Sequence, residues 1–202
     1  MLTWINSYDP LPGEFLFLDR DGVINADSPD YIKSWKEYHF YPDALKALAW
    51  LKSRRINAIV ISNQSALNRG YIQHEDFWDM HTRMVAAIEE RGGAILAAFY
   101  CPHRPDEGCS CRKPSPGMIL AAREIFRVPS QGCFFIGDRA SDMETAERGG
   151  CRGVLLDRSP LKTETMDAPA PTLDKRTLRR STLMEAVEAI YSSSPPGLRH
   201  TQ

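Results

Sequence analysis

The chain reads EFLFLDRDGV at residues 14–23, an apolar run that ends abruptly in two carboxylates and a glycine. A short apolar run bounded by polar residues is typical of a strand that is buried on both faces. The two carboxylates, Asp19 and Asp21, can face one cleft if the backbone turns after the strand, and Gly22 makes that turn easy. This stretch therefore predicts a buried strand whose carboxyl end carries chemistry.

Working outward, short apolar runs alternate with segments of helical periodicity. We expect further strands at residues 56–61, 94–100, 133–136 and 153–156, and helices at residues 42–54, 75–91, 116–126, 142–148 and 182–191. This alternation predicts an α/β fold with a doubly wound, mainly parallel sheet, formed by a single domain over residues 1–191. Residues 160–180 hold three prolines and are expected to form a surface loop, and residues 192–202 a disordered tail.

The composition limits the classes of protein to which the chain can belong. Its 202 residues are 43% apolar and 25% charged, with a formal net charge of −1, so no basic field favours nucleic acid. The apolar runs are too short to span a bilayer, and the first twelve residues lack the pattern of a secretory signal. We therefore expect a cytoplasmic monomer with a small-molecule substrate and no membrane or nucleic-acid partner.

Open parallel sheets bind ligands beyond the carboxyl ends of their strands, so residues at these positions are candidates for function. One carboxylate of Asp19 and Asp21 can attack a phosphorus atom, while the other gives a proton to the leaving alcohol and later takes one from water. Clustered carboxylates repel each other unless a cation lies between them, and Mg²⁺ both prefers oxygen ligands and bridges to phosphate. The first strand end therefore predicts a magnesium-dependent phosphate site.

The later strand ends carry residues that complement this site. Hydroxyl, amide and backbone N–H groups after the second strand can cradle a phosphate, at Ser62, Asn63, Gln64 and Ser65. Lys113 can neutralise phosphate charge and keep a nucleophile ionised, and Asp138 can complete the magnesium site. Asp142 is either a partner behind the metal ligands or the N-cap of the next helix.

In their order along the chain, these motifs resemble those of the haloacid dehalogenase phosphatase superfamily, from about residue 15 to residue 156. The resemblance implies that Asp19 is the nucleophile and that Asp21 is the acid and base, with its backbone carbonyl on the Mg²⁺. It also implies that Ser62 and Lys113 complete the catalytic set and that Asp138 is the later metal ligand.

Three cysteines and a histidine crowd residues 101–111. Cys101, His103, Cys109 and Cys111 form a full tetrahedral ligand set with no open position, which predicts structural Zn²⁺ rather than catalytic Zn²⁺. A nucleic-acid-binding finger fits less well, because few basic residues are nearby and no recognition helix follows. The remaining cysteines, Cys133 and Cys151, lie in apolar stretches and are expected to be small core residues.

The cysteine segment resembles the superfamily branch that lacks a large cap domain, which includes heptose 1,7-bisphosphate phosphatases and histidinol-phosphate phosphatases. Residues 27–32, 62–65, 69–71 and 112–118 resemble the heptose-bisphosphate members, although Ala66 replaces a glycine and the first of these segments is one residue longer. The resemblance implies substrate contacts at Asp27, Asp30, Tyr31, Asn63, Gln64 and Ser65. A second phosphate would also suit the guanidinium groups of Arg69, Arg112 and Arg139.

Two alternatives to this substrate class stay open at the level of sequence. Residues 137–142 also resemble the histidinol-phosphate branch, and Asp27, Asp30 and Tyr31 can serve an amine as well as sugar hydroxyls. A non-catalytic phosphate-binding or signalling protein would also place acidic residues at strand ends. The complete set of strand-end residues, Asp21 included, argues against this second alternative.

Overall fold

The computed structural model of the chain describes residues 1–7, 9–129, 132–158 and 177–192. All strands in this part of the chain belong to one seven-stranded sheet of order β1-β4-β3-β2-β5-β6-β7. The strands are β1 (Leu2–Ile5), β2 (Phe15–Leu18), β3 (Asn57–Asn63), β4 (Ala97–Cys101), β5 (Phe134–Gly137), β6 (Arg152–Leu156) and β7 (Leu178–Arg180). Only β1 runs antiparallel to its neighbour, β4.

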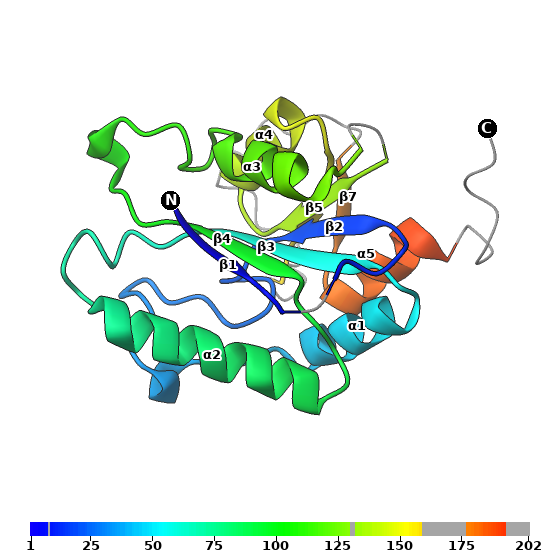
Figure 1. Cartoon of the computed structure of the whole chain (residues 1–202), viewed down its shortest axis with the longest axis horizontal. Coiled ribbons are helices and arrows are strands. Elements are labelled where there is room, and N and C mark those ends of the chain that lie inside the picture. The colour runs from blue at the N-terminus through cyan, green and yellow to red at the C-terminus, as the bar shows by residue number, and fades with distance from the viewer. Residues whose placement is uncertain (8, 130–131, 159–176, 193–202) are drawn as a thin grey trace, which may run out of the picture.

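Five α-helices cover both faces of this sheet, which confirms the expected doubly wound architecture (Figure 1). They are α1 (Pro42–Ser53), α2 (His74–Glu90), α3 (Gly117–Phe126), α4 (Ala140–Arg148) and α5 (Leu183–Tyr191), with 3₁₀ turns at Trp35–Glu37 and Pro105–Glu107. The helices α1, α2 and α5 pack on one face, and α3 and α4 pack on the other. None of these described helices combines the length and apolar character needed to cross a bilayer.

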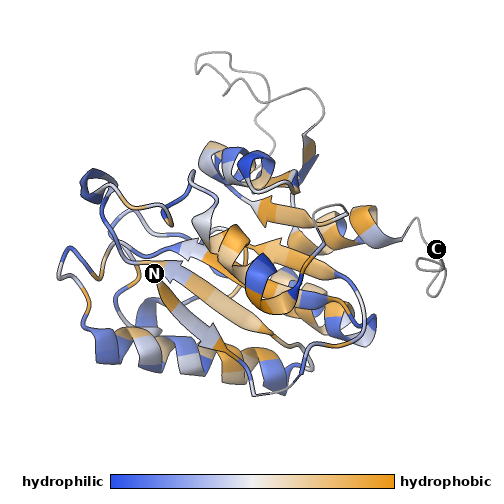
Figure 2. Ribbon diagram, turned by 45° about the horizontal axis from the view of Figure 1, so that its top comes forward, coloured by the Kyte–Doolittle hydropathy of each residue, from blue (hydrophilic) through white to orange (hydrophobic). Residues whose placement is uncertain are grey.

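The central strands are apolar on both sides because both faces of the sheet are covered. In β2, Leu16 and Leu18 belong to the core under α1, α2 and α5, while Phe17 belongs to the core under α3 and α4. All three side chains are fully buried, and each contributes roughly 1.5–3 kcal/mol of hydrophobic stabilisation. Figure 2 shows the resulting apolar sheet between helices with mixed faces.

The order of the strands fixes where a ligand can bind. From β2 the chain continues to β3 and β4 on one side, and it then returns to form β5, β6 and β7 on the other side. A crevice forms at such a reversal, beyond the carboxyl ends of the two adjacent strands. Asp19 follows β2 and Asp138 follows β5, so both aspartates lie at this crevice.

Some local expectations need correction. The edge strands β1 and β7 were not predicted, because both are short and half-exposed and neither carries a continuous apolar run. The surface loop expected at residues 160–180 is wrong at Leu178–Arg180, which is β7, and residues 160–176 lie outside the described part of the chain. The helix expected from residue 142 begins at Ala140. All of the expected tail except Ser192 also lies outside the described residues.

Candidate active site

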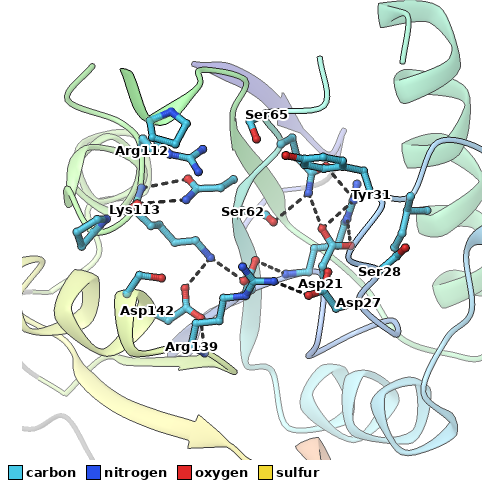
Figure 3. Close-up of a pocket in the computed structure, with 18 of the residues that line it drawn as sticks. Asp21, Asp27, Ser28, Tyr31, Ser62, Ser65, Arg112, Lys113, Arg139 and Asp142 are labelled. Carbon is cyan, nitrogen blue, oxygen red and sulfur yellow. Dashed lines mark hydrogen bonds and ion pairs between the residues drawn. The ribbon is translucent and has the colours of Figure 1, made fainter. Parts of the chain in front are cut away.

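A cavity of about 600 Å³ opens beyond the carboxyl ends of β2 and β3, and polar side chains from several segments point into it (Figure 3). The predicted site residues that line it are Asp19, Asp21, Asp27, Tyr31, Ser62, Asn63, Gln64, Ser65, Arg112, Lys113 and Arg139. The fold therefore gathers residues that are far apart in the sequence, at the edge of the sheet that the topology indicates.

The centre of the cavity holds a buried cation between two carboxylates. Lys113 Nζ lies 2.7 Å from Asp19 Oδ2 and 2.7 Å from Asp142 Oδ1. Burial alone would lower the pKa of Lys113, but Asp142 and Asp19 raise it to about 12. Burial raises the pKa of Asp19 to about 6, against the lowering effect of the lysine. The lysine is thus permanently charged and holds the Asp19 carboxylate in place.

Asp142 contacts both the buried lysine and the start of α4. One of its oxygens pairs with Lys113, and the other accepts a hydrogen bond of 3.0 Å from the backbone N–H of Arg139. Arg139 is the N-cap of α4, so the expectation that Asp142 occupies this position is wrong by three residues. The carboxylate nevertheless caps the helix from inside its first turn, because it accepts an N–H at the helix start.

Asp138 faces the same centre from the end of β5. Its Oδ1 is buried and has no hydrogen-bond partner among the described residues. Carboxylate oxygens of Asp19, Asp138 and Asp142 all lie within 4.8 Å of one another. Burial and the negative charge of Asp19 raise the pKa of Asp138 to about 7. Converging carboxylates with an unpartnered oxygen fit a hard divalent cation such as Mg²⁺.

Gly22 is needed for this approach of two strand ends. Its φ is +82°, a left-handed conformation that favours glycine, and a Cβ there would lie 2.2 Å from Asp138 Oδ2. Any side chain at position 22 would therefore displace the Asp138 carboxylate.

The carboxylate of Asp21 is surrounded by donors. Arg20 donates from Nε to Oδ1 and from Nη2 to Oδ2, each at 3.0 Å. Gln64 Nε2 donates to Oδ2 at 2.7 Å, and Asn25 Nδ2 donates to Oδ1 at 2.9 Å. Burial alone would raise the pKa of Asp21, but Arg20 and these amides lower it below the usual range. In this arrangement Asp21 stays ionised to a lower pH than Asp19 and Asp138, whose pKa values are raised.

Arg20 was missed by the sequence analysis, which singled out only the aspartates on either side of it. The guanidinium is 2% exposed, lies over the rings of Tyr38 and Phe77, and donates to Gln64 Oε1 at 2.9 Å. The period-two alternation of the strand contains a usable signal, because Arg20 shares a face with Leu18, which points into the same core layer.

Arg158 was also missed, and it supports the backbone that follows Asp21. Its guanidinium donates to the carbonyl oxygens of Gly22 at 3.1 Å and Val23 at 3.0 Å. The same group forms a two-point ion pair with Asp43 at 2.9 and 3.0 Å and lies 3.7 Å from the centre of the Tyr41 ring. An arginine just after β6 carries no sequence signal for this task, because its partners precede it by more than a hundred positions.

Two predicted residues at the end of β3, Asn63 and Gln64, make hydrogen bonds within the protein. Asn63 Oδ1 accepts from the backbone N–H of Lys113 at 3.0 Å, and its Nδ2 donates to the carbonyl of Lys113 at 3.2 Å. Gln64 donates to Ser62 Oγ at 3.1 Å as well as to Asp21. These amides therefore fix the positions of the two charged groups that face the cavity.

The rim of the cavity holds the remaining predicted contacts. Asp27 and Arg139 form an ion pair there, and Tyr31 is held in the left-handed region at φ 63°. Asp30 and Arg69 are exposed and are not among the residues that line the cavity, so the structure does not bring these two to the site.

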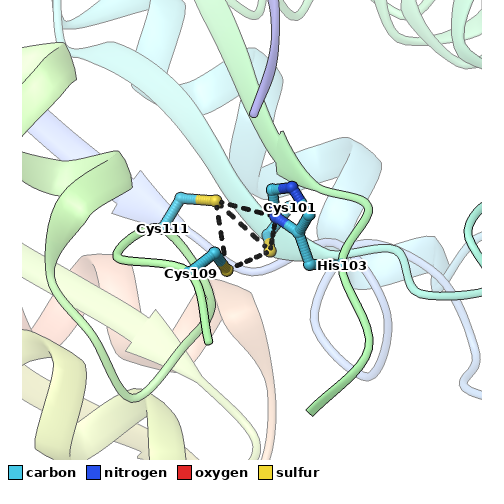
Figure 4. A group of neighbouring side chains, drawn as sticks. All are labelled: Cys101, His103, Cys109 and Cys111. Carbon is cyan, nitrogen blue, oxygen red and sulfur yellow. Dashed lines mark hydrogen bonds between the residues drawn. The ribbon is translucent and has the colours of Figure 1, made fainter. Parts of the chain in front are cut away.

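The cysteine-rich loop forms a compact cluster beside the cavity (Figure 4). The three Sγ–Sγ distances are 3.4 to 3.6 Å, and His103 Nδ1 lies 3.4 Å from Cys101 Sγ and 3.3 Å from Cys111 Sγ. Ligands at roughly 2.0–2.3 Å from a tetrahedral zinc ion would lie about 3.4–3.8 Å apart. The cluster is therefore compatible with zinc in both its ligands and its spacing.

The cysteine loop also builds one wall of the cavity. Arg112, one residue beyond Cys111, donates from Nη1 to the carbonyl of His103 at 2.9 Å. Pro105, within the loop, lines the cavity together with Arg112. Any movement of the cysteine cluster would therefore move this wall.

Comparisons with known proteins agree with the fold. Residues 110–176 match the HAD-hydrolase-like family model. A D-glycero-beta-D-manno-heptose-1,7-bisphosphate 7-phosphatase of Pseudomonas putida is 43% identical over 143 residues, covering 71% of this chain and 82% of the relative. The enzyme of the same description from Pseudomonas aeruginosa is 40% identical over 156 residues, covering 77% and 87%.

A solved structure extends the similarity to three dimensions. The D,D-heptose 1,7-bisphosphate phosphatase of Bordetella bronchiseptica, complexed with magnesium and phosphate, superposes with a TM-score of 0.81 at 32% identity, over 90% of this chain and all of that one. Fold, site and similarity together define a phosphatase of the haloacid dehalogenase superfamily. Within that superfamily, the chain belongs to the D-glycero-beta-D-manno-heptose-1,7-bisphosphate 7-phosphatase family.

Proposed function

We propose that this protein removes the 7-phosphate of a D-glycero-D-manno-heptose 1,7-bisphosphate through a phosphoaspartate on Asp19, with Mg²⁺ bound at the active site. The observation that carries the proposal is the position of Asp19 at the end of β2. There it is held by Lys113 and faces Asp138 across the crevice.

In the first step, an Asp19 oxygen attacks phosphorus, the bond from phosphorus to the sugar oxygen breaks, and Asp21 gives a proton to that oxygen. In the second step, water attacks the phosphoaspartate, Asp21 takes the proton from the water, and inorganic phosphate leaves. The donors around Asp21 stabilise its ionised form, which accepts this proton, whereas the first step requires the protonated form of Asp21, against its lowered pKa.

The charges around the reacting phosphate have separate tasks. Lys113 and Ser62 would contact the phosphoryl oxygens, since both face the cavity next to Asp19. Asp19 and Asp138, with the backbone carbonyl of Asp21, would hold the Mg²⁺. When bound, this ion supplies positive charge that offsets the phosphate and the clustered carboxylates.

Zinc in the cysteine cluster would have a structural task. Four protein ligands leave no open position on the ion, so it would take no part in the reaction. It would instead fix the wall that carries Arg112, which is tied to the backbone of His103.

The choice of substrate depends on what lies beyond the reacting phosphate. Arg112 follows the cysteine cluster directly and lines the cavity, so its guanidinium can reach a second phosphate in a two-point arrangement. Arg139 adds positive charge at the rim, although Asp27 pairs with it there. The printed names of the relatives favour the same substrate.

The test compares kcat/KM for the heptose 1,7-bisphosphate, histidinol phosphate and a simple phosphomonoester. The heptose bisphosphate should be preferred, and Arg112→Ala should cost roughly 1.5–3 kcal/mol with it, the size of a charged hydrogen bond. With the simple monoester, Arg112→Ala should have little effect. A preference for histidinol phosphate would overturn the substrate, and failure to release phosphate from any of the three would overturn the enzymatic proposal.

A further inference from the structure

Two cysteines lie at the amino ends of two neighbouring strands, β5 and β6, whereas the active site lies at the carboxyl ends of the strands. Cys133 directly precedes β5, and Cys151 directly precedes β6. The parallel register pairs Phe134 with Arg152, and the Arg152 N–H donates to the Cys133 carbonyl at 2.9 Å. The two cysteines are thus the next facing pair, at the usual strand separation of about 4.8 Å, within the Cα range of about 4.4–6.8 Å for a disulfide.

The side chains of this pair are in contact with each other and with a cation. The Sγ atoms of Cys133 and Cys151 are in direct contact, 2.9 Å apart. Arg123 of α3 places Nη2 at 2.8 Å from Cys133 Sγ and 3.7 Å from Cys151 Sγ, and it also donates to the Gly150 carbonyl at 3.0 Å. A guanidinium on a thiol favours the thiolate, which is the reactive form of cysteine.

The two thiols are not equivalent in this arrangement. The contact with Cys151 and the charge of Arg123 lower the pKa of Cys133 to about 6, although burial opposes the shift. Cys133 is thereby the nucleophile of the pair, and Cys151 keeps its proton. Both cysteines belong to the apolar core under α3 and α4, as expected, but an apolar contact alone would not recruit an arginine.

The environment of Cys133 and Cys151 also differs from that of the cysteines in the cysteine-rich loop. Cys101, Cys109 and Cys111 converge with an imidazole, whereas Cys133 and Cys151 belong to no group of three or more metal-ligand side chains in the described part of the chain. A guanidinium beside the sulfurs would repel a metal ion. The chemistry that suits two adjacent thiols and a cation is thiol–disulfide exchange.

We propose that Cys133 and Cys151 are a redox site that forms a reversible disulfide with a small-molecule disulfide as oxidant. The Cys133 thiolate attacks one sulfur of the oxidant, whose S–S bond breaks, and one thiolate leaves. Cys151 then loses its proton to solvent and attacks the Cys133 sulfur, and the second small thiolate leaves. Two protein thiols are oxidised by two electrons, and one small disulfide is reduced to two thiols.

The position of the pair determines whether an oxidant can reach the sulfurs and what a disulfide there would change. Cys133 and Cys151 are 4% and 8% exposed, but Gly132, Gly150 and Arg152 beside them are exposed, so the sulfurs lie just beneath the surface. The bond would close the segment from residue 133 to residue 151, which contains β5, α4 and Asp138. It should therefore raise the thermal midpoint and leave kcat/KM within about twofold, because the strands already lie at disulfide spacing.

The test treats the zinc-loaded protein with oxidised glutathione at neutral pH, blocks free thiols with an alkylating agent, and maps tryptic peptides by mass spectrometry. Arg139 and Arg148 separate the two cysteines into different peptides. We expect a Cys133–Cys151 cross-link that dithiothreitol removes. Cys151→Ser should accumulate glutathione on Cys133, whereas Cys133→Ser should leave Cys151 largely unmodified.

Two further measurements separate reactivity from folding. Arg123→Met should slow alkylation of Cys133 at least several-fold at neutral pH, whereas Arg123→Lys should slow it less, with circular dichroism confirming that both variants are folded. Unmodified Cys133 and Cys151 in wild-type protein after prolonged exposure would overturn the proposal. A cross-link that joins only Cys101, Cys109 or Cys111 would also overturn it. So would equal amounts of bound glutathione in Cys133→Ser and Cys151→Ser.

Discussion

The cysteine cluster and the carboxylate cluster both gather charged ligands, but the chain assembles them in different ways. The cysteine cluster takes all four ligands from residues 101–111, a single loop that leaves β4 (Figure 4). The carboxylate cluster takes Asp19 from the end of β2 and Asp138 from the end of β5. Lys113 reaches it from a third segment, and Figure 3 shows this lysine beside Asp142. One cluster is local, whereas the other exists only because β2 and β5 are neighbours in the sheet.

This difference indicates what each cluster contributes. A local cluster fixes the shape of its own loop, so its loss should change the wall of the cavity more than the reaction. A cluster assembled by topology holds its groups in one geometry through the whole core, and that geometry is what a reaction requires. The predictions that follow test this division, from the largest expected effect to the smallest.

Asp19→Asn should lower kcat at least about 10³-fold, or about 4 kcal/mol in activation free energy, because an amide cannot attack phosphorus and be regenerated by water. The zinc content should not change, because the cysteine loop shares no ligand with Asp19. Steady-state phosphate release and elemental analysis measure the two effects. Asp76→Asn, the same change at an exposed position of α2, is the matched control and should leave turnover unchanged. Near-normal turnover in Asp19→Asn would refute the mechanism.

Arg158→Ala should lower kcat roughly tenfold to a hundredfold with little change in KM, because the loop after Asp21 loses its support at Gly22 and Val23. Added guanidinium ion should restore part of kcat, which a general loss of stability would not allow. Arg158→Lys retains one charged donor and should lie between wild type and Arg158→Ala. An increase in KM at constant kcat would instead assign Arg158 to substrate binding.

Much of the fold could be predicted because its central strands are buried on both faces. Burial on both faces requires continuous apolar runs, and such runs are visible in the sequence at residues 15–18 and 57–61. The edge strands could not be found in the same way. In β1, half-exposed and exposed residues alternate over only four positions, and its strand conformation depends on pairing with β4, which local sequence does not reveal.

The same contrast applies to the site. Asp19 was predicted because a carboxylate directly after a strand is a local pattern. Lys113 was predicted because it follows the cysteine-rich segment of residues 101–111, which is also a local pattern. Arg20 was not predicted, because its environment is built by rings from distant segments, Tyr38 and Phe77. Asp30 and Arg69 were included through resemblance and through the ligand groups they could bind, but both are exposed outside the cavity lining.

The carboxylate cluster should make stability depend on pH and on magnesium. The pKa values of Asp19 and Asp138 are raised to about 6 and about 7, so the folded protein without metal binds more protons than the unfolded chain between about pH 4 and pH 7. Its free energy of unfolding should therefore fall as pH rises through this window, by roughly 3 kcal/mol or more.

Magnesium should offset this loss, so its stabilising effect should be larger at about pH 8 than at about pH 5. Thermal midpoints with Mg²⁺ and with a chelator that spares bound zinc measure the difference. Asp138→Asn should flatten the pH dependence without metal and weaken the magnesium effect. A magnesium effect that is equal at both pH values would show that these carboxyls do not control the site.

Cys109→Ser should have the smallest effect on the reaction, although it removes a ligand from a complete set. The zinc content should fall, while kcat stays within about twofold and KM for the bisphosphate rises roughly threefold to tenfold, about 1 kcal/mol of substrate binding. The reason is the hydrogen bond from Arg112 to the His103 carbonyl, through which the cluster positions the cavity wall. Asp19 and Asp138 depend on the sheet and should keep their geometry.

Cys133→Ser provides the matched control for this last change, since it makes the same substitution outside the cluster and should leave both zinc content and KM unchanged. The increase in KM should also be smaller for a simple phosphomonoester, which has no second group for Arg112 to bind. A fall in kcat of the size expected for Asp19→Asn would mean that the local cluster supports the reaction directly. Full zinc content and unchanged KM would mean that Cys109 is not a ligand and that the loop is held by its own backbone.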